Sequence, residues 1–191
     1  MQVDAIAIVC GLKHHGEHGA IVRCLTEAHG LLAGYIQGAR SKAMRPLLIP
    51  GNGVAGVWRQ RTENQLASLS VESVHSRGHL LGEPLASAAI EWATALTAAS
   101  LPEAHPYPRL YAALDGVLTA IENAPSARGW AQALADYEAL LISELGYGEA
   151  GLDDQTMTQN RTRLVRHILG DRQDMLAARE RLVDRLKKAV A

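Results

Sequence analysis

The sequence predicts an α+β protein in which a small β-barrel is followed by an α-helical bundle. Up to about residue 80, short β-rich segments alternate with glycine-containing turns, which is typical of consecutive strands. From Pro84 onward the chain is rich in alanine, and its apolar residues recur at helical spacing. At 191 residues the chain is long enough for two small domains. We therefore expect one domain over residues 1–80 and a second over residues 81–191.

Five strands are predicted in the first domain, over residues 3–10, 20–26, 31–37, 54–61 and 66–74. Turns are expected between them, at Lys13–Gly19, Ala28–Gly30 and Pro50–Gly53, because glycine and proline favour tight turns. Strands joined by turns without intervening helices predict an antiparallel meander. A closed barrel of the OB type buries such strands without exposed edges, and barrels of this type commonly bind oligonucleotides. Trp58 lies out of phase with Arg59 and Arg61 and is expected in the core.

Five helices are predicted in the second domain, over residues 85–101, 109–123, 127–145, 155–169 and 172–189. Ser126 is expected to cap the third helix and Asp171 the fifth. Gly146 and Gly170 are expected to end the third and fourth helices. Together these segments predict an α-helical bundle.

Charge is unevenly distributed along the chain. The overall net charge is −1, but residues 1–80 carry +3, residues 81–160 carry −9 and residues 161–191 carry +5. Basic ends around an acidic middle indicate surfaces with different partners. The only two cysteines, Cys10 and Cys24, lie in strand-like segments and are expected to be buried free thiols. No leader peptide or membrane-spanning segment is expected, which predicts a cytoplasmic protein.

A cationic stretch, Gly38–Pro46, follows the third predicted strand. It contains Arg40, Lys42 and Arg45, and no acidic residue lies between positions 27 and 63. On a β-scaffold such a loop suits nucleic acid phosphates, and we predict that it binds DNA together with Arg59 and Arg61. The alternative is an ordinary solvated loop.

The last two predicted helices are also basic, with nine cations in the final 31 residues. We predict that they form a basic groove for DNA or for an acidic peptide tail of a partner protein. Arg166, Arg179 and Arg185 are the residues predicted to hold the tail, combining ion pairs with an apolar pocket. The alternative is a solvated helix face.

No catalytic residue, metal ligand or cofactor is predicted. His14 and His18 have a spacing that converges on a helix, but their glycine-rich surroundings indicate a turn. The sequence contains neither a phosphate-binding Gly-Lys-Ser/Thr triplet nor a Gly-x-Ser-x-Gly nucleophile elbow. These observations predict a binding protein and not an enzyme.

The chain resembles the bacterial recombination mediator family RecO over nearly its whole length. The resemblance is carried by several short motifs in a characteristic order: Gly16-Glu17, Ala20–Val22, Thr26–Gly30, Gly38–Ser41, Pro50-Gly51, Pro106–Tyr111, Glu138–Gly148, Asp171-Arg172 and Leu176–Leu182. It implies a non-enzymatic protein of the RecFOR repair pathway that binds single- and double-stranded DNA and anneals complementary strands. It also implies contacts with RecR and with the acidic C-terminal tail of single-stranded DNA-binding protein, and a role in loading RecA.

The sequence departs from this family in one respect. Many members carry a four-cysteine zinc module after the third bundle helix, whereas no cysteine follows Cys24 here. The resemblance is therefore to a short, zinc-free member. The competing expectation is a protein-interaction adaptor whose OB-type barrel does not bind nucleic acid.

Overall fold

The computed structural model describes residues 2–62, 65–124, 126–148 and 157–190. The chain divides into two compact units. The barrel unit comprises Met1–His79 together with Leu101–Tyr111, and the helical unit comprises Leu80–Ser100 together with Ala112–Ala191. The segment Leu101–Tyr111 thus clusters with the strands, although its sequence position is beyond residue 80. Within the described ranges, no helix has the length and apolarity needed to cross a membrane.

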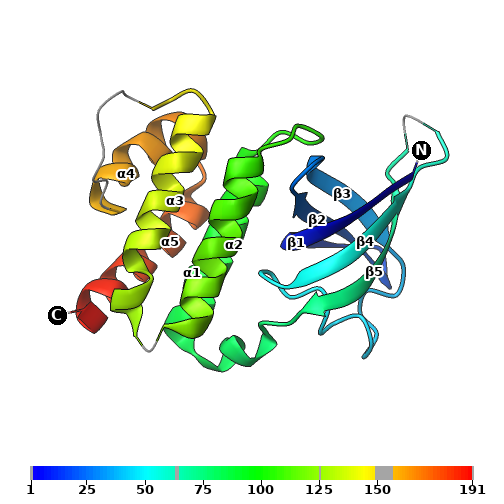
Figure 1. The fold of residues 1–191 in the computed structure, drawn as a ribbon, viewed down its shortest axis with the longest axis horizontal. Helices are drawn as coiled ribbons and strands as arrows, with labels where there is room; N and C mark the ends of the chain where they lie inside the picture. Colours follow the sequence, from blue (N-terminus) through cyan, green and yellow to red (C-terminus); the bar gives the residue numbers. More distant parts are fainter. Residues whose placement is uncertain (1, 63–64, 125, 149–156, 191) are drawn as a thin grey trace. The chain divides into compact units, whose positions relative to one another are not determined.

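The barrel unit is a closed ring of five strands, which confirms the predicted α+β class (Figure 1). The strands are β1 (Gln2–His15), β2 (Gly19–Thr26), β3 (Gly30–Ile36), β4 (Gly53–Arg59) and β5 (Ser68–His75).

The predicted meander is wrong, because the order around the ring is β1-β2-β3-β5-β4. β4 pairs antiparallel with β1, and β3 meets β5 in parallel at Tyr35 and Ser68. The connection between β3 and β4, residues 37–52, is too long for a tight hairpin turn. It therefore allows β4 to reach the far side of the ring instead of pairing with β3.

Alternate residues of each strand fill the interior of the barrel. Val9, Val22, Val54 and Val71 belong to this core, and so does Trp58, as predicted, with only 3% of its surface exposed. Gly34 provides the space that the indole needs. A Cβ at that position would lie 2.6 Å from the Cβ of Leu69 and 3.0 Å from Nε1 of Trp58.

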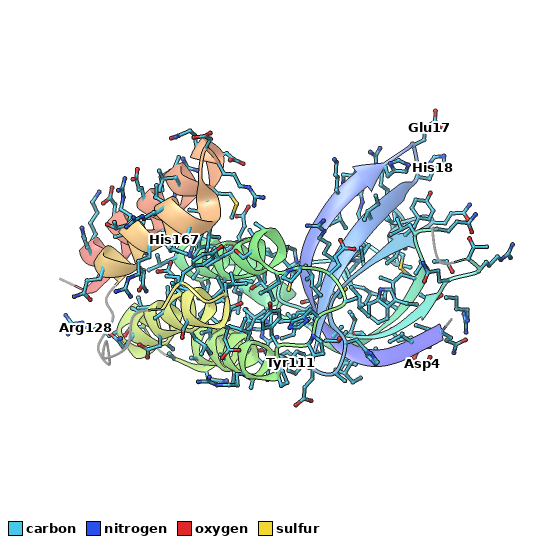
Figure 2. The ribbon with its side chains drawn as sticks, turned by 90° about the horizontal axis from the view of Figure 1, so that it is seen from above. Asp4, Glu17, His18, Tyr111, Arg128 and His167 are labelled. Carbon is cyan, nitrogen blue, oxygen red and sulfur yellow. The ribbon has the colours of Figure 1, made fainter. Side chains whose placement is uncertain are left out.

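The hairpin between β1 and β2 is longer than predicted. Lys13, His14 and His15 were expected in a turn, but they continue β1, which pairs with β2 as far as His15 and Gly19. The turn itself is short, and Gly16 adopts the left-handed conformation that it requires, with φ of +67°. Glu17 and His18 lie at the outer tip of this hairpin (Figure 2).

The helical unit and the segments that flank it contain α1 (Pro84–Ser100), α2 (Pro108–Asn123), α3 (Ala131–Glu144), α4 (Met157–Leu164) and α5 (Gln173–Val190). Short 3-10 turns occur at Gly78–Gly82 and Ala127–Gly129, and a π-helical turn, Val165–Leu169, continues α4. The predicted start of the fourth helix, residues 155–156, falls outside the described residues. The helices expected from the sequence are otherwise present with shifted ends.

The predicted helix over 127–145 is interrupted at Trp130, which separates the 3-10 turn from α3. Ser126 precedes the 3-10 turn but makes no side-chain capping hydrogen bond, so its predicted role is wrong. The other end was predicted correctly. Gly146 has φ of +84° and its N–H donates to the carbonyl of Ser143, while the N–H of Tyr147 donates to the carbonyl of Ile142. This pattern is the Schellman motif that glycine favours at helix ends.

Candidate functional site

The loop between β3 and β4 presents the three cations of the stretch Gly38–Pro46 to solvent. Arg40, Lys42 and Arg45 are all exposed, and no carboxylate among the described residues pairs with them. Their mutual repulsion is therefore uncompensated within the described part of the chain. Such a loop attracts polyanions, since bringing phosphate close relieves this repulsion.

Apolar contacts hold this loop against the barrel. Ala39 and Leu48 are buried, with 3% and 4% of their surfaces exposed, and they pack on the barrel core with Met44 and Leu47. Within the loop, the N–H of Met44 donates to Oγ of Ser41 over 3.2 Å. Ala39 and Met44 of the stretch thus pack against the barrel, whereas its three cations are exposed.

Side-chain hydrogen bonds of Asn52 hold the end of the loop against the barrel. Its Nδ2 donates to the carbonyl of Pro46 at 2.7 Å, and its Oδ1 accepts a hydrogen bond from the backbone N–H of Arg77 at 2.8 Å. The guanidinium of Arg77 donates in turn to the carbonyl of Gly51 at 2.6 Å. Asn52 and Arg77 are 2% and 5% exposed. The sequence indicated only a turn here, because nothing in it links Asn52 to a residue 25 positions away.

Arg59 and Arg61 lie apart from the place where the loop joins β4. The loop enters β4 at Gly53, and Arg59 is the last residue of that strand, about 20 Å further along at ~3.3 Å per residue. Figure 1 shows the end of β4 near the N-terminus of the chain and the loop at the other end of the barrel. Nε of Arg59 donates to Oε1 of Gln2. Arg61, predicted within the strand, follows it. The five predicted DNA-binding residues therefore form two groups.

A groove of about 370 Å³ runs between α1 and α5 in the helical unit. The buried side chains of Trp92 and Leu182 line it, together with Met175 and three alanines. The exposed side chains of Arg181 and Arg185 also line it. Glu91 and Asp174 complete the lining. The groove therefore combines an apolar surface with two arginines, which is the chemistry that an acidic peptide with an apolar residue requires.

Of the predicted peptide-binding residues, only Arg185 lines this groove. Arg166 is exposed on the π-helical turn and is not part of the lining. Arg181, which the prediction did not include, does line it. The sequence could have indicated Arg181, because it precedes Arg185 by four positions and residues four apart on a helix share a face.

The prediction for Arg179 is wrong. Its side chain is 1% exposed and forms a two-point ion pair with Glu138, so it offers no charge to a partner at the surface. The cause is the position of Arg179 on the face of α5 that packs into the helical unit. A helical arginine can be assigned to solvent or to the core only once the neighbouring helices are known.

The described residues contain no group of three or more His, Cys, Asp or Glu side chains placed to hold a metal ion. Cys10 and Cys24 are buried free thiols, as predicted. Burial raises the pKa of Cys10 to about 12, and burial together with the neighbouring Cys10 also raises the pKa of Cys24. Both groups therefore stay protonated and unreactive near neutral pH.

Two family profiles match the chain in sequence order. The profile described as "Recombination protein O N terminal" matches residues 1–77, and the one described as "Recombination protein O C terminal" matches residues 81–150. Together they cover the barrel strands and the helical region as far as the end of α3 and the residues that follow it.

Curated relatives agree with these profiles. The chain is 39% identical over 151 residues to the DNA repair protein RecO of Gluconacetobacter diazotrophicus, a match that covers 78% of this chain and 59% of that protein. It is 37% identical over 148 residues to RecO of Paracoccus denitrificans, covering 78% and 60%. It is 37% identical over 161 residues to RecO of Bradyrhizobium diazoefficiens, covering 83% and 62%. The chain thus spans about 60% of the length of these relatives, and on the two profiles and these identities it belongs to the RecO family.

Proposed function

We propose that this chain is a non-enzymatic recombination mediator of DNA repair. In this role it binds single- and double-stranded DNA, anneals complementary strands, and acts with RecR to load RecA onto DNA coated by single-stranded DNA-binding protein. Membership of the RecO family supports the proposal. The observation that carries it is the set of three exposed cations on the loop between β3 and β4, Arg40, Lys42 and Arg45, which no carboxylate of the described residues compensates.

The proposed mechanism of DNA binding is electrostatic. The loop cations contact phosphates and displace counterions, so affinity depends on salt and little on sequence. Arg59 and Arg61 extend the contact at the other end of β4. When two strands occupy the same basic surface, the repulsion between their phosphates is partly neutralised. Complementary strands can then meet and pair, which is how a purely binding protein accelerates annealing.

A titration of labelled single-stranded DNA at several salt concentrations tests this mechanism. We expect the double variant Arg40→Ala with Lys42→Ala to weaken the binding of unrelated sequences equally. The slope of log affinity against log salt should flatten by roughly one to two units, because each phosphate contact to a single strand contributes about 0.7. A double variant in the C-terminal helix, Lys187→Ala with Lys188→Ala, removes the same charge and should leave the slope unchanged.

The groove between α1 and α5 is the proposed site for the acidic C-terminal tail of single-stranded DNA-binding protein. Arg181 and Arg185 would pair with the acidic residues and the terminal carboxylate of the tail, while Trp92, Met175 and Leu182 would receive its apolar side chain. Glu91 and Asp174 at the same groove would restrict where the acidic residues can lie.

The second candidate function is a protein-interaction adaptor that binds no nucleic acid. The groove just described supports it, because a peptide site needs no DNA-binding surface elsewhere. The same titration separates the two functions. An adaptor would bind neither single- nor double-stranded DNA at physiological salt, whereas the mediator binds both.

A further inference from the structure

A second pocket opens on the wall of the barrel. It has a volume of about 400 Å³. Its lining comes from β1, the start of β3, the end of β4, the segment before β5 and residues 103–104, and it includes Leu31, Ala33, Trp58, Gln60, Leu66 and Glu103. All these residues belong to the barrel unit. The proposed functions above make no use of this pocket.

The pocket lies where the ring of strands is incompletely hydrogen-bonded. On the side away from β2, β3 has two short contacts: the N–H of Tyr35 donates to the carbonyl of Ala67, and the carbonyl of Leu31 accepts from the N–H of Ala104. These positions are four residues apart, about 13 Å along an extended strand. Ala33 lies midway between them.

The backbone groups of Ala33 face this gap. In an antiparallel pair, successive residues direct their N–H and C=O groups to opposite edges of the strand. Since Leu31 and Tyr35 bond away from β2, Ala33 must point its N–H and C=O the same way. Among the described residues, no backbone group on that side bonds to Ala33. Within the described part of the chain, the wall of the pocket therefore contains a backbone donor and a backbone acceptor without a backbone partner.

The remaining lining is apolar or neutral. Leu66 is 47% exposed at the pocket, and the buried Trp58 has an indole N–H without a hydrogen-bond partner in the described structure. Gln60 and Gln65 contribute amide side chains. The single carboxylate, Glu103, is 3.2 Å from the guanidinium of Arg23, so its charge is largely balanced. This lining suits a neutral ligand with apolar faces and hydrogen-bonding edges.

Two arginines lie next to lining residues of the pocket in the sequence. Arg59 lies in sequence between two lining residues, Trp58 and Gln60, and Arg61 directly follows Gln60. Neither arginine pairs with a described carboxylate. A neutral pocket whose lining residues have two arginines as sequence neighbours suits a nucleotide, because its base is neutral and its phosphates are anionic. Enzymes that extrude bases hold them in the same way, between apolar side chains and against hydrogen-bonding groups.

From this geometry we infer that the pocket binds one unstacked base of a single-stranded nucleic acid, with Arg59 and Arg61 contacting the adjacent phosphates. The inference rests on the proposed function, in that the chain must first bind DNA through its phosphates. An extended peptide fits less well. The bonds at Leu31 and Tyr35 already occupy both ends of the gap, which leaves room for no more than about two residues of an added strand.

A comparison of normal and abasic oligonucleotides isolates the contribution of the base. We expect the protein to bind an oligothymidylate of about 15 nucleotides roughly tenfold more tightly than an abasic oligomer of the same length at the same salt, as one well-held base contributes about 1–3 kcal/mol. Equal affinities for the two oligomers would overturn the proposal that the pocket binds a base. They would leave the proposed phosphate contacts unaffected. Failure to bind either oligomer would overturn both proposals.

Two variants assign the difference to this pocket. Ala33→Leu fills it, and Leu66→Ala removes an exposed side chain without disturbing the core. Both should reduce the preference for thymidylate to less than about threefold while affinity for the abasic oligomer stays unchanged. Ala55→Leu, on β4 but outside the lining, is the matched control and should retain the preference. An undiminished preference in Leu66→Ala and in a folded Ala33→Leu would overturn the assignment.

Nuclear magnetic resonance provides a readout that does not depend on affinity. The chain has three tryptophans, so the Trp58 indole N–H is one of three signals and Trp58→Phe identifies it. We expect this signal to shift when thymidylate is added and to stay in place with the abasic oligomer. A shift of the Trp58 signal with an acidic peptide, and none with thymidylate, would overturn the base site in favour of a peptide site.

Discussion

Arg179 and Glu138 form a two-point ion pair inside the helical unit. Nε of the arginine is 2.8 Å from one carboxylate oxygen, Nη2 is 2.6 Å from the other, and both side chains are at most 1% exposed. The same carboxylate accepts hydrogen bonds from Nε1 of Trp92 and Nδ2 of Asn160. One buried charge pair thus joins α1, α3, α4 and α5.

Breaking this pair should destabilise the protein strongly. Arg179→Met leaves the Glu138 carboxylate buried without its counterion, and we expect the free energy of unfolding to fall by roughly 3–5 kcal/mol. Denaturant unfolding followed by circular dichroism measures the change. The control is Arg161→Met, which breaks the half-exposed pair of Arg161 with Glu180 and should cost no more than about 1 kcal/mol. Similar losses in both variants would contradict this account of the network.

Asn52 should matter for DNA binding although it carries no charge. Asn52→Ala removes the hydrogen bonds to Pro46 and Arg77, and we expect a loss of stability of about 1–3 kcal/mol. Affinity for single-stranded DNA should fall as well, because the loop cations lose their fixed positions. Hydrogen exchange should show faster opening of residues 37–52. Asn123→Ala, which removes a comparable but exposed bond to the carbonyl of Thr119, should change none of these properties.

The peptide groove should be sensitive to the sign of charge at two positions. Arg181→Glu with Arg185→Glu should weaken the binding of an acidic peptide ending in an apolar residue by roughly tenfold or more, since attraction becomes repulsion. Calorimetric titration measures the affinity. Lys187→Glu with Lys188→Glu changes the net charge equally at positions outside the groove lining. Equal losses in the two double variants would mean that binding depends only on overall charge.

The buried thiols should destabilise the fold in alkali. The pKa of Cys10 rises from 9.0 to about 12 on burial, so the unfolded chain loses this proton at lower pH than the folded protein. The stabilisation is complete below about pH 9 and is lost as the pH approaches 12. We expect the melting temperature to fall over this range, and to fall less in Cys10→Ala with Cys24→Ala. At pH 8, thiol reagents should react only after unfolding; rapid labelling of the native protein would contradict the burial.

Much of this architecture could be predicted from local patterns. Short β-rich segments between glycine-containing turns indicated the five strands. The phase of Trp58 against Arg59 and Arg61 placed it in the core, because side chains of a strand face its two sides in turn. The glycine at position 146 indicated the end of α3, since only a residue tolerant of positive φ fits there. The clustering of Arg40, Lys42 and Arg45 likewise indicated an exposed loop, because unpaired cations are costly to bury.

Long-range contacts decided the rest. The ring order depends on the pairing of β4 with β1, whose paired residues are 45 to 57 positions apart, and the loop position depends on Asn52 and Arg77. Arg179 and Arg185 look alike in sequence, yet one is buried against Glu138 and the other lines a groove. A local pattern specifies which residues share a face of an element. Only the packing of that face against other elements determines whether its charges meet a buried counterion or solvent.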